Sequence, residues 1–138
     1  MEDYVPLSVL RMVYDSSRKL YSLRIMASIR PSALAEITSV FAKHNINILC
    51  IELGARSTSD ERGTAFLVVD FTKSAMDVKQ IIKELEGLPS VLEVKLMDPS
   101  IPGLIIDTGH FPLIIGPWRG IIFRVEFSST LSKALGEN

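Results

Sequence analysis

The sequence is poor in the residues that most metal sites and all disulfides use. It has one cysteine, Cys50, and two histidines, His44 and His110, in 138 residues. One cysteine cannot form an intrachain disulfide, and two histidines in unlike contexts do not form the ligand cluster of a structural metal site. We therefore expect no metal, no cofactor and no catalytic residue. Cys50, inside a strand pattern, is interpreted as a buried and unreactive thiol.

Charge of one sign and long apolar runs are also missing. The net charge is −1, which gives no basic surplus for nucleic acid or an anionic membrane. No apolar run is long enough for a transmembrane helix, and the opening MEDYVPL lacks the pattern of a signal peptide. With 47% apolar and 22% charged residues, the composition is that of a globular protein, and 138 residues allow one domain plus a modest appendage. We expect a cytoplasmic protein with no direct contact to nucleic acid or membrane.

Between residues 20 and 97 the spacing of apolar residues switches repeatedly. Alternation predicts half-buried strands, and recurrence every three or four residues predicts amphipathic helices. Strands are expected at 20–29, 46–55, 64–71 and 91–97, and helices at 31–44 and 74–86. The order β-α-β-β-α-β predicts an α+β fold of the ferredoxin-like type, with two helices on one face of a four-stranded antiparallel sheet.

The same patterns predict which side chains are buried. The expected core consists of Ile25, Leu34, Ile37, Phe41, Leu67, Val69, Ile81, Leu85 and Val94. In the last strand Leu92 and Leu96 are also expected to point inward, and Phe66 is expected to point away from the helices. Ser74 and Asp77 have the spacing of a capping box for the second helix, which Gly87 ends.

Two flanking segments differ from this body in composition. Residues 1–19 predict a short helix or an extended arm. Residues 99–120 hold four of the seven prolines and four of the eight glycines, so that the domain at 20–98 is followed by a linker. Within the final segment, 99–138, residues 120–127 alternate as one strand, and Ser128 could cap a final short helix. These elements cannot enclose a core of their own.

The loop before the first helix has residues suited to an anion. A helix N-terminus offers free N–H groups, and Arg30 beside it can bind a carboxylate through two hydrogen bonds. Asn47 opens the next strand and is expected to converge with Arg30 and Ser32 on one small anionic ligand. Alternatively, Arg30 is a solvated loop residue and Asn47 only satisfies backbone groups.

The segment RPSALAEITSVFAKHNINI with its flanking strands resembles the ACT domain, a ligand-sensing regulatory module, and the resemblance covers residues 20–97. It implies a non-catalytic sensor of a small molecule, often an amino acid, bound near this loop at the interface of a homodimer. The ligand-binding residues it implies are Arg30, Pro31, Ser32, Ala33, Leu34, Asn47 and Ile48.

The sequence departs from the family pattern at three positions. Ser32 replaces the usual glycine after proline, and Ala27 and Ile29 replace a histidine and an asparagine of serine-sensing members. These departures leave open a more apolar ligand or no ligand at all.

Three other interpretations concern the site and the tail. An acylphosphatase-like hydrolase could use Arg30 to hold a phosphate and Asn47 to orient water, although Pro31 and Ala33 do not suit its phosphate loop. A ligand-free interaction module would pair its edge strand with a partner. The tail is also similar to the opening of a 4-vinyl reductase-type small-molecule-binding domain. We further expect that the strand at 120–127, with Phe111 and Trp118, is buried in a homodimer.

Overall fold

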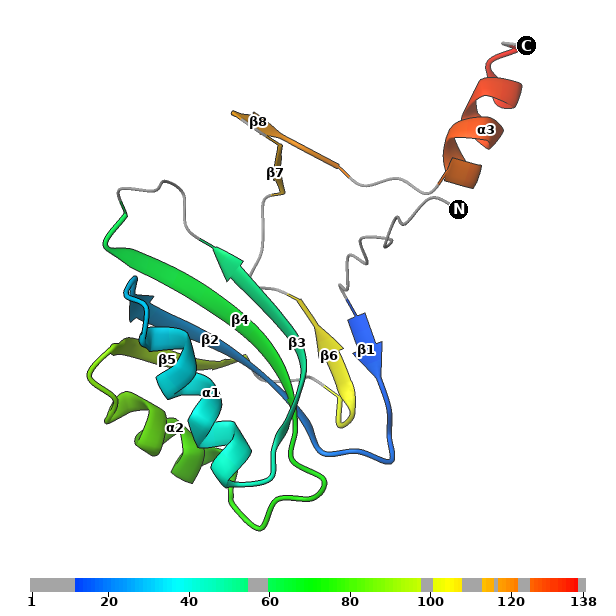
Figure 1. Ribbon diagram of the computed structural model, residues 1–138. Helices are drawn as coiled ribbons and strands as arrows, with labels where there is room; N and C mark the ends of the chain where they lie inside the picture. Colours follow the sequence, from blue (N-terminus) through cyan, green and yellow to red (C-terminus); the bar gives the residue numbers. More distant parts are fainter. Residues whose placement is uncertain are drawn as a thin grey trace, which may run out of the picture.

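The computed structural model describes residues 12–54, 60–97, 101–107, 113–115, 117–121 and 125–136. Its centre is an antiparallel sheet in the order β3-β4-β2-β5. The strands are β2 (Leu20–Ser28), β3 (Asn47–Gly54), β4 (Arg62–Asp70) and β5 (Val91–Met97). Two helices, α1 (Ala33–Lys43) and α2 (Val78–Glu86), cover one face of this sheet (Figure 1). The predicted βαββαβ ferredoxin-like fold is confirmed.

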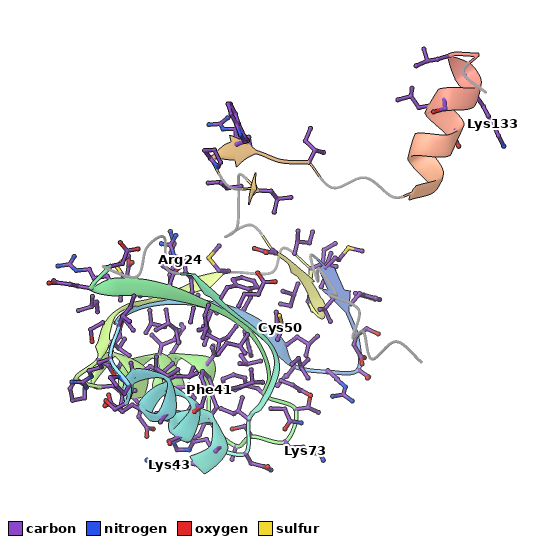
Figure 2. The ribbon with its side chains drawn as sticks, turned by 45° about the horizontal axis from the view of Figure 1, so that its top comes forward. Arg24, Phe41, Lys43, Cys50, Lys73 and Lys133 are labelled. Carbon is purple, nitrogen blue, oxygen red and sulfur yellow. The ribbon has the colours of Figure 1, made fainter. Side chains whose placement is uncertain are left out.

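The main core lies between the helices and the sheet. Phe41 reaches from α1 toward the strands (Figure 2), where it is fully buried with Leu23, Ile25, Leu67 and Ile81. All but one of the nine residues that the sequence predicted for the core are buried. Because these side chains come from both helices and from strands β2, β4 and β5, one cluster holds the two layers together.

Leu34 is the predicted core residue that the structure places elsewhere, since its side chain is 41% exposed. The buried stripe of α1 consists of Ala33, Ile37, Val40 and Phe41. Leu34 follows Ala33 by one residue, about 100° around the helix, and so lies at the edge of the covered face.

Leu92 was also predicted to be inward and is 51% exposed. Strand β5 changes register against β2 between Met26 and Ala27. At such an irregularity the strict alternation of faces is lost. Val91 and Val94, three residues apart, are therefore both buried.

The other face of the sheet is partly covered by a short ribbon. Strand β1 (Met12–Tyr14) pairs antiparallel with β6 (Leu104–Ile106), and Ile105 packs on Leu20, Phe66 and Val68. Phe66 lies on the face of the sheet away from the helices, as predicted. Its side chain is nevertheless buried there, with only 3% of it exposed. Of the two forms predicted for residues 1–19, Met12–Tyr14 take the extended one, and residues 1–11 lie outside the described residues.

A tight turn at Gly103 sets the position of this ribbon. Gly103 has φ +79°, and a Cβ there would lie 2.6 Å from the carbonyl oxygen of Asp15. The backbone N–H of Asp15 donates to the Gly103 carbonyl at 3.0 Å. Only glycine combines this left-handed conformation with so close an approach of two backbones.

The capping box of α2 lies three residues later than the sequence predicted. The side chain of Asp77 accepts from the N–H of Lys79 at 2.8 Å, and that of Gln80 accepts from the N–H of Asp77 at 3.0 Å. Ser74 instead accepts from the N–H of Met76 in the preceding turn. Asp77 is therefore the N-cap residue, and not the third residue of the helix.

The C-terminal segment contains a small hairpin, β7 (Ile114–Ile115) with β8 (Trp118–Arg119), and the helix α3 (Val125–Ala134). The strand predicted at 120–127 is wrong, because α3 already begins at Val125; Phe111 lies outside the described residues. In sequence Phe127, Leu131 and Ala134 recur at helical spacing, and a short alternation before them does not exclude a helix. In the part of the chain that the structure describes, no helix is long and apolar enough to cross a membrane.

Candidate functional site

A pocket of about 260 Å³ lies between the N-terminal half of α1 and one end of the sheet. Its lining comes from the end of β2 and the loop after it (residues 27–30), the first turns of α1, the end of β3 and the start of β4. From α1 come Ala33, Leu34 and Ile37, and from β3 come Leu53 and Gly54. Most of these side chains are apolar, so that the pocket suits a ligand with an apolar body.

The exposed position of Leu34 is explained by this pocket. Leu34 on α1, Ile29 after β2 and Leu53 on β3 all line it, and all three are exposed large apolar side chains. Their exposure is therefore grouped around one opening. A grouping of exposed apolar side chains is typical of a binding site.

The structure brings together only some of the residues that the sequence predicted for the site. Arg30, Ala33 and Leu34 line the pocket. Pro31 and Ser32 lie in the adjoining loop and are exposed, and Ser32 is the N-cap residue of α1.

Asn47 and Ile48 lie at the other end of the sheet. Asn47 pairs with Asp70, which also pairs with Leu20 at the start of β2. Strands β2 and β3 flank β4 and are both antiparallel to it, so that their starts lie together and their ends lie together. Arg30, which follows the end of β2, is therefore near the end of β3 and not near Asn47. The expected convergence of Arg30 and Asn47 within one chain is wrong.

The same geometry bears on the hydrolase alternative. That chemistry needs Arg30 and Asn47 on one phosphate and one water, within hydrogen-bond reach of both. Their placement at opposite ends of the sheet removes its basis within one chain. Among the described residues, no group of three histidine, cysteine or acidic side chains could hold a metal ion.

Arg30 already has a carboxylate partner. Its Nη2 donates to Glu36 Oε1 at 2.9 Å and to Oε2 at 3.1 Å. Glu36 Oε2 also accepts from the hydroxyl of Ser90, a residue that is fully buried. The hydroxyls of Ser90 and Ser32 and the Arg30 guanidinium outweigh desolvation and lower the pKa of Glu36. An ion pair therefore stands beside the pocket.

Sequence reasoning missed Glu36, Ser90 and the β3 end of the pocket. Glu36 and Ser90 are 54 residues apart, and no local pattern connects them. Leu53 and Gly54 could have been found. The βαββαβ order alone places β2 and β3 on either side of β4 and parallel to each other, so that their ends lie together.

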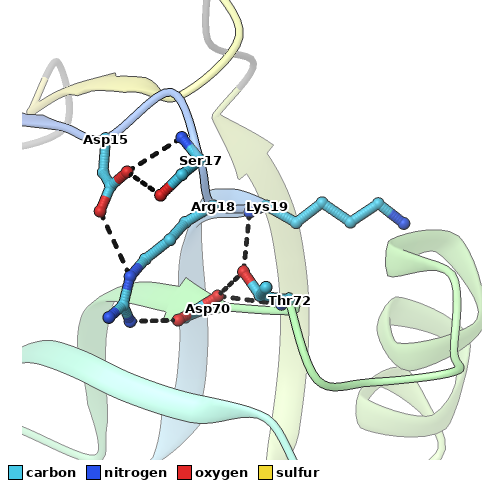
Figure 3. Close-up of polar contacts among 6 residues, drawn as sticks. All are labelled: Asp15, Ser17, Arg18, Lys19, Asp70 and Thr72. Carbon is cyan, nitrogen blue, oxygen red and sulfur yellow. Dashed lines mark hydrogen bonds and ion pairs between the residues drawn. The ribbon is translucent and has the colours of Figure 1, made fainter.

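A second polar cluster lies at the far end of the sheet (Figure 3). Asp70 is 5% exposed and accepts from Arg18 Nη1 at 2.7 Å and from the hydroxyl and N–H of Thr72. The N–H of Lys19 donates to Thr72 Oγ1 at 3.0 Å. Burial raises the pKa of Asp70, but the hydrogen bonds from Thr72 and Arg18 outweigh it, and the pKa is lowered. Asp70, Thr72 and Arg18 are hydrogen-bonded within this cluster, which is typical of a structural role.

His44 takes part in a contact between the helices. Its Nε2 lies 2.7 Å from Glu84 Oε2, and Lys43 Nζ lies 2.7 Å from Glu84 Oε1. Lys43 and His44 lower the pKa of Glu84. His44 lies at the C-terminal end of α1, whereas the pocket adjoins its N-terminal end.

Comparison with known proteins supports the class that this fold and pocket indicate. The family model of the ACT domain matches residues 19–95. A GTP pyrophosphokinase of Myxococcus xanthus is 33% identical over 72 residues, which are 51% of this chain and 9% of that protein. The chain thus spans only a small part of the length of this relative.

Two solved structures are also similar to part of this chain. The ACT domain from GTP pyrophosphokinase of Chlorobium tepidum is 24% identical with a TM-score of 0.48, over 58% of this chain and 99% of that one. The acetolactate synthase small subunit from Thermotoga maritima is 22% identical with a TM-score of 0.48, over 59% of this chain and 48% of that one.

The family match covers more than half of the chain, and the chain belongs to the ACT domain family. The resemblance noted in the segment RPSALAEITSVFAKHNINI is thereby confirmed. The part of the chain that carries it is a regulatory domain.

Proposed function

We propose that this domain senses a small molecule in the pocket between the end of β2, the start of α1 and the end of β3. The observation that carries the proposal is the coincidence of two findings. The only loop of the sequence that resembles an ACT ligand loop, residues 30–34, supplies Arg30, Ala33 and Leu34 to a pocket with an apolar lining. A purely structural loop does not require an open pocket at this position.

A bound ligand would contact four elements, namely β2, α1, β3 and β4. The pocket joins α1 to both β3 and β4, so that a bound molecule adds contacts between the helix layer and the sheet. A molecule that binds the folded chain and not the unfolded chain stabilises it by about 2.7 kcal/mol at a hundredfold excess over Kd. In a longer protein this difference in free energy could be passed to a neighbouring domain or subunit.

The proposal also includes a homodimer. Strand β3 is an edge of the sheet and carries the exposed apolar side chains Leu49, Ile51 and Leu53. Leu53 both lines the pocket and belongs to this edge. A second subunit that paired with β3 would therefore lie next to the ligand.

The test is a thermal-shift screen across free amino acids, small organic acids and small uncharged apolar molecules. We expect at least one class to raise the melting temperature by several degrees at high excess over Kd. Leu34→Trp, which fills the pocket, should abolish the shift. Leu92→Trp is the matched control, because Leu92 is an exposed leucine outside the lining and its replacement should keep the shift.

Two results would count against ligand sensing in this pocket. A complete screen without any shift would favour the ligand-free interaction module. A shift of equal size in wild type and Leu34→Trp would place the ligand elsewhere.

A further inference from the structure

The ion pair beside the pocket bears on the charge of the ligand. Arg30 is the only cationic side chain among the described residues that line the pocket. Arg62 pairs with Ser28 in the sheet but is not part of the lining. Any ligand carboxylate in the pocket would therefore depend on Arg30 for a full opposite charge.

Arg30 is already neutralised from within the chain. Both oxygens of Glu36 accept from Arg30 Nη2, at 2.9 and 3.1 Å. Glu36 lies in the first turn of α1, directly after the loop, so that its carboxylate is available to Arg30 at a high effective concentration. A ligand carboxylate would have to share Arg30 with a like charge only a few ångströms away.

Glu36 is also held in place by groups other than Arg30. The hydroxyl of Ser90 donates to Glu36 Oε2, and Ser90 is 0% exposed in the segment just before β5. The N–H of Ser28 donates to the Ser90 carbonyl at 2.8 Å, which connects this segment to the end of β2. Displacing Glu36 would leave the buried Ser90 hydroxyl without its acceptor, which is unfavourable.

The remaining lining matches an apolar molecule of modest size. Ala27, Ile29, Ala33 and Leu53 contribute apolar side chains, and the Ser28 hydroxyl already donates to the Ser90 carbonyl at 3.3 Å. The volume of about 260 Å³ lies just below the range of about 300–1,000 Å³ that is usual for drug-sized ligands. The pocket therefore suits a compact apolar group.

We infer that Glu36 acts as a built-in carboxylate for Arg30, and that the pocket accepts a small uncharged apolar molecule in preference to a free amino acid or another carboxylate. This inference rests on the proposed sensing function and adds the chemical class of the ligand. Glu36 is the residue that determines the specificity: it satisfies Arg30 and repels a second carboxylate.

The experiment compares three probes with the same branched apolar group, namely 4-methylpentan-1-ol, 4-methylpentanoate and L-leucine. Binding to the full chain is measured by NMR titration of the backbone amides of residues 27–30, 32–34 and 63–65, and by thermal shift. We expect the alcohol to bind about tenfold or more tightly than either carboxylate, as follows from an unfavourable charge in the site.

Glu36→Gln removes the built-in carboxylate and leaves Arg30 free. Its ratio of alcohol to carboxylate affinity should fall by about tenfold relative to wild type. Ser90→Ala should also lower this ratio, but by less. It is the alternative test if Glu36→Gln does not fold. Glu84→Gln removes a carboxylate that is paired with Lys43 at the other end of α1, and it should leave the ratio unchanged.

The outcomes separate this inference from the proposed function. Carboxylates that bind wild type as tightly as the alcohol, or an unchanged ratio in both Glu36→Gln and Ser90→Ala, would overturn the inference and leave ligand sensing intact. If none of the three probes binds but the wider screen finds a carboxylate ligand, the inference is likewise wrong. If neither the probes nor the screen gives binding, the proposed function fails and the inference fails with it.

Discussion

At the scale of the residue, Asp70 shows how one buried carboxylate connects two segments. It is held by Arg18 before β2 and by Thr72 after β4, and the N–H of Lys19 donates in turn to Thr72. Its pKa lies below the ordinary 3.8, since hydrogen bonds to the charged form outweigh burial. The unfolded chain therefore binds a proton at Asp70 before the folded chain does, as the pH falls.

This order of protonation predicts acid sensitivity. The stabilisation by Asp70 is complete above the unfolded pKa and is lost as the pH falls through the lower folded value. Asp70→Asn should reduce the free energy of unfolding at neutral pH by about 1–3 kcal/mol, and its stability should fall less steeply below about pH 4. Urea unfolding across the acidic range measures both.

The control for Asp70 is Glu86→Gln, which removes an exposed carboxylate from the end of α2. Its acid profile should follow that of the wild type. If the stability of Asp70→Asn fell as steeply with pH as that of the wild type, Asp70 would not contribute to the loss of stability in acid.

At the scale of the element, helix α1 divides its apolar residues between two tasks. Val40 and Phe41 pack in the core, Leu34 lines the pocket, and Ile37 does both. The difference follows from position, because Leu34 lies in the first turn of α1, which the pocket adjoins.

Truncation should separate these tasks. Leu67→Ala, at a fully buried position of β4, should reduce the free energy of unfolding by about 2–5 kcal/mol through cavity formation. Leu34→Ala should reduce it by less than about 1 kcal/mol, since the side chain is already partly in water. Denaturant unfolding of both variants provides the comparison. Equal losses would mean that Leu34 is a core residue after all.

At the scale of the whole molecule, the two edge strands of the sheet differ in their exposed apolar side chains. Strand β3 presents Ile51 and Leu53, and β5 presents Leu92. Unpaired edge strands with apolar side chains favour pairing with another chain. The earlier expectation that a tail strand at 120–127 would pair with an edge loses its basis, because α3 begins at Val125. The β3 edge replaces it as the expected interface.

Light scattering should give roughly twice the 15.3 kDa mass of one chain, as two sheets joined at their edges would have. Ile51→Lys should shift the mass toward that of a monomer, because a lysine on the edge opposes pairing. Leu92→Lys, the same change on the opposite edge strand, should leave the dimer intact. A wild-type monomer at high micromolar concentration would contradict the proposed dimer.

The sequence by itself determined the order of the elements, the helical cover on one face and most of the core. These follow from the spacing of apolar residues along a single segment, and Ile37, Phe41 and Leu67 needed no knowledge of the rest of the chain. The family was also readable, because residues 30–34 and the strand entry at 46–48 form a local motif.

Only the tertiary structure decided which segments meet. It placed Arg30 beside Leu53 rather than Asn47, since β2 and β3 run parallel on either side of β4. It also joined Glu36 to Ser90 across 54 residues and covered Phe66 with β6. Periodicity fixes the face on which a side chain lies, but the partner at that face comes from a distant segment. The candidate site, which consists of such distant pairs, was therefore predicted only in part.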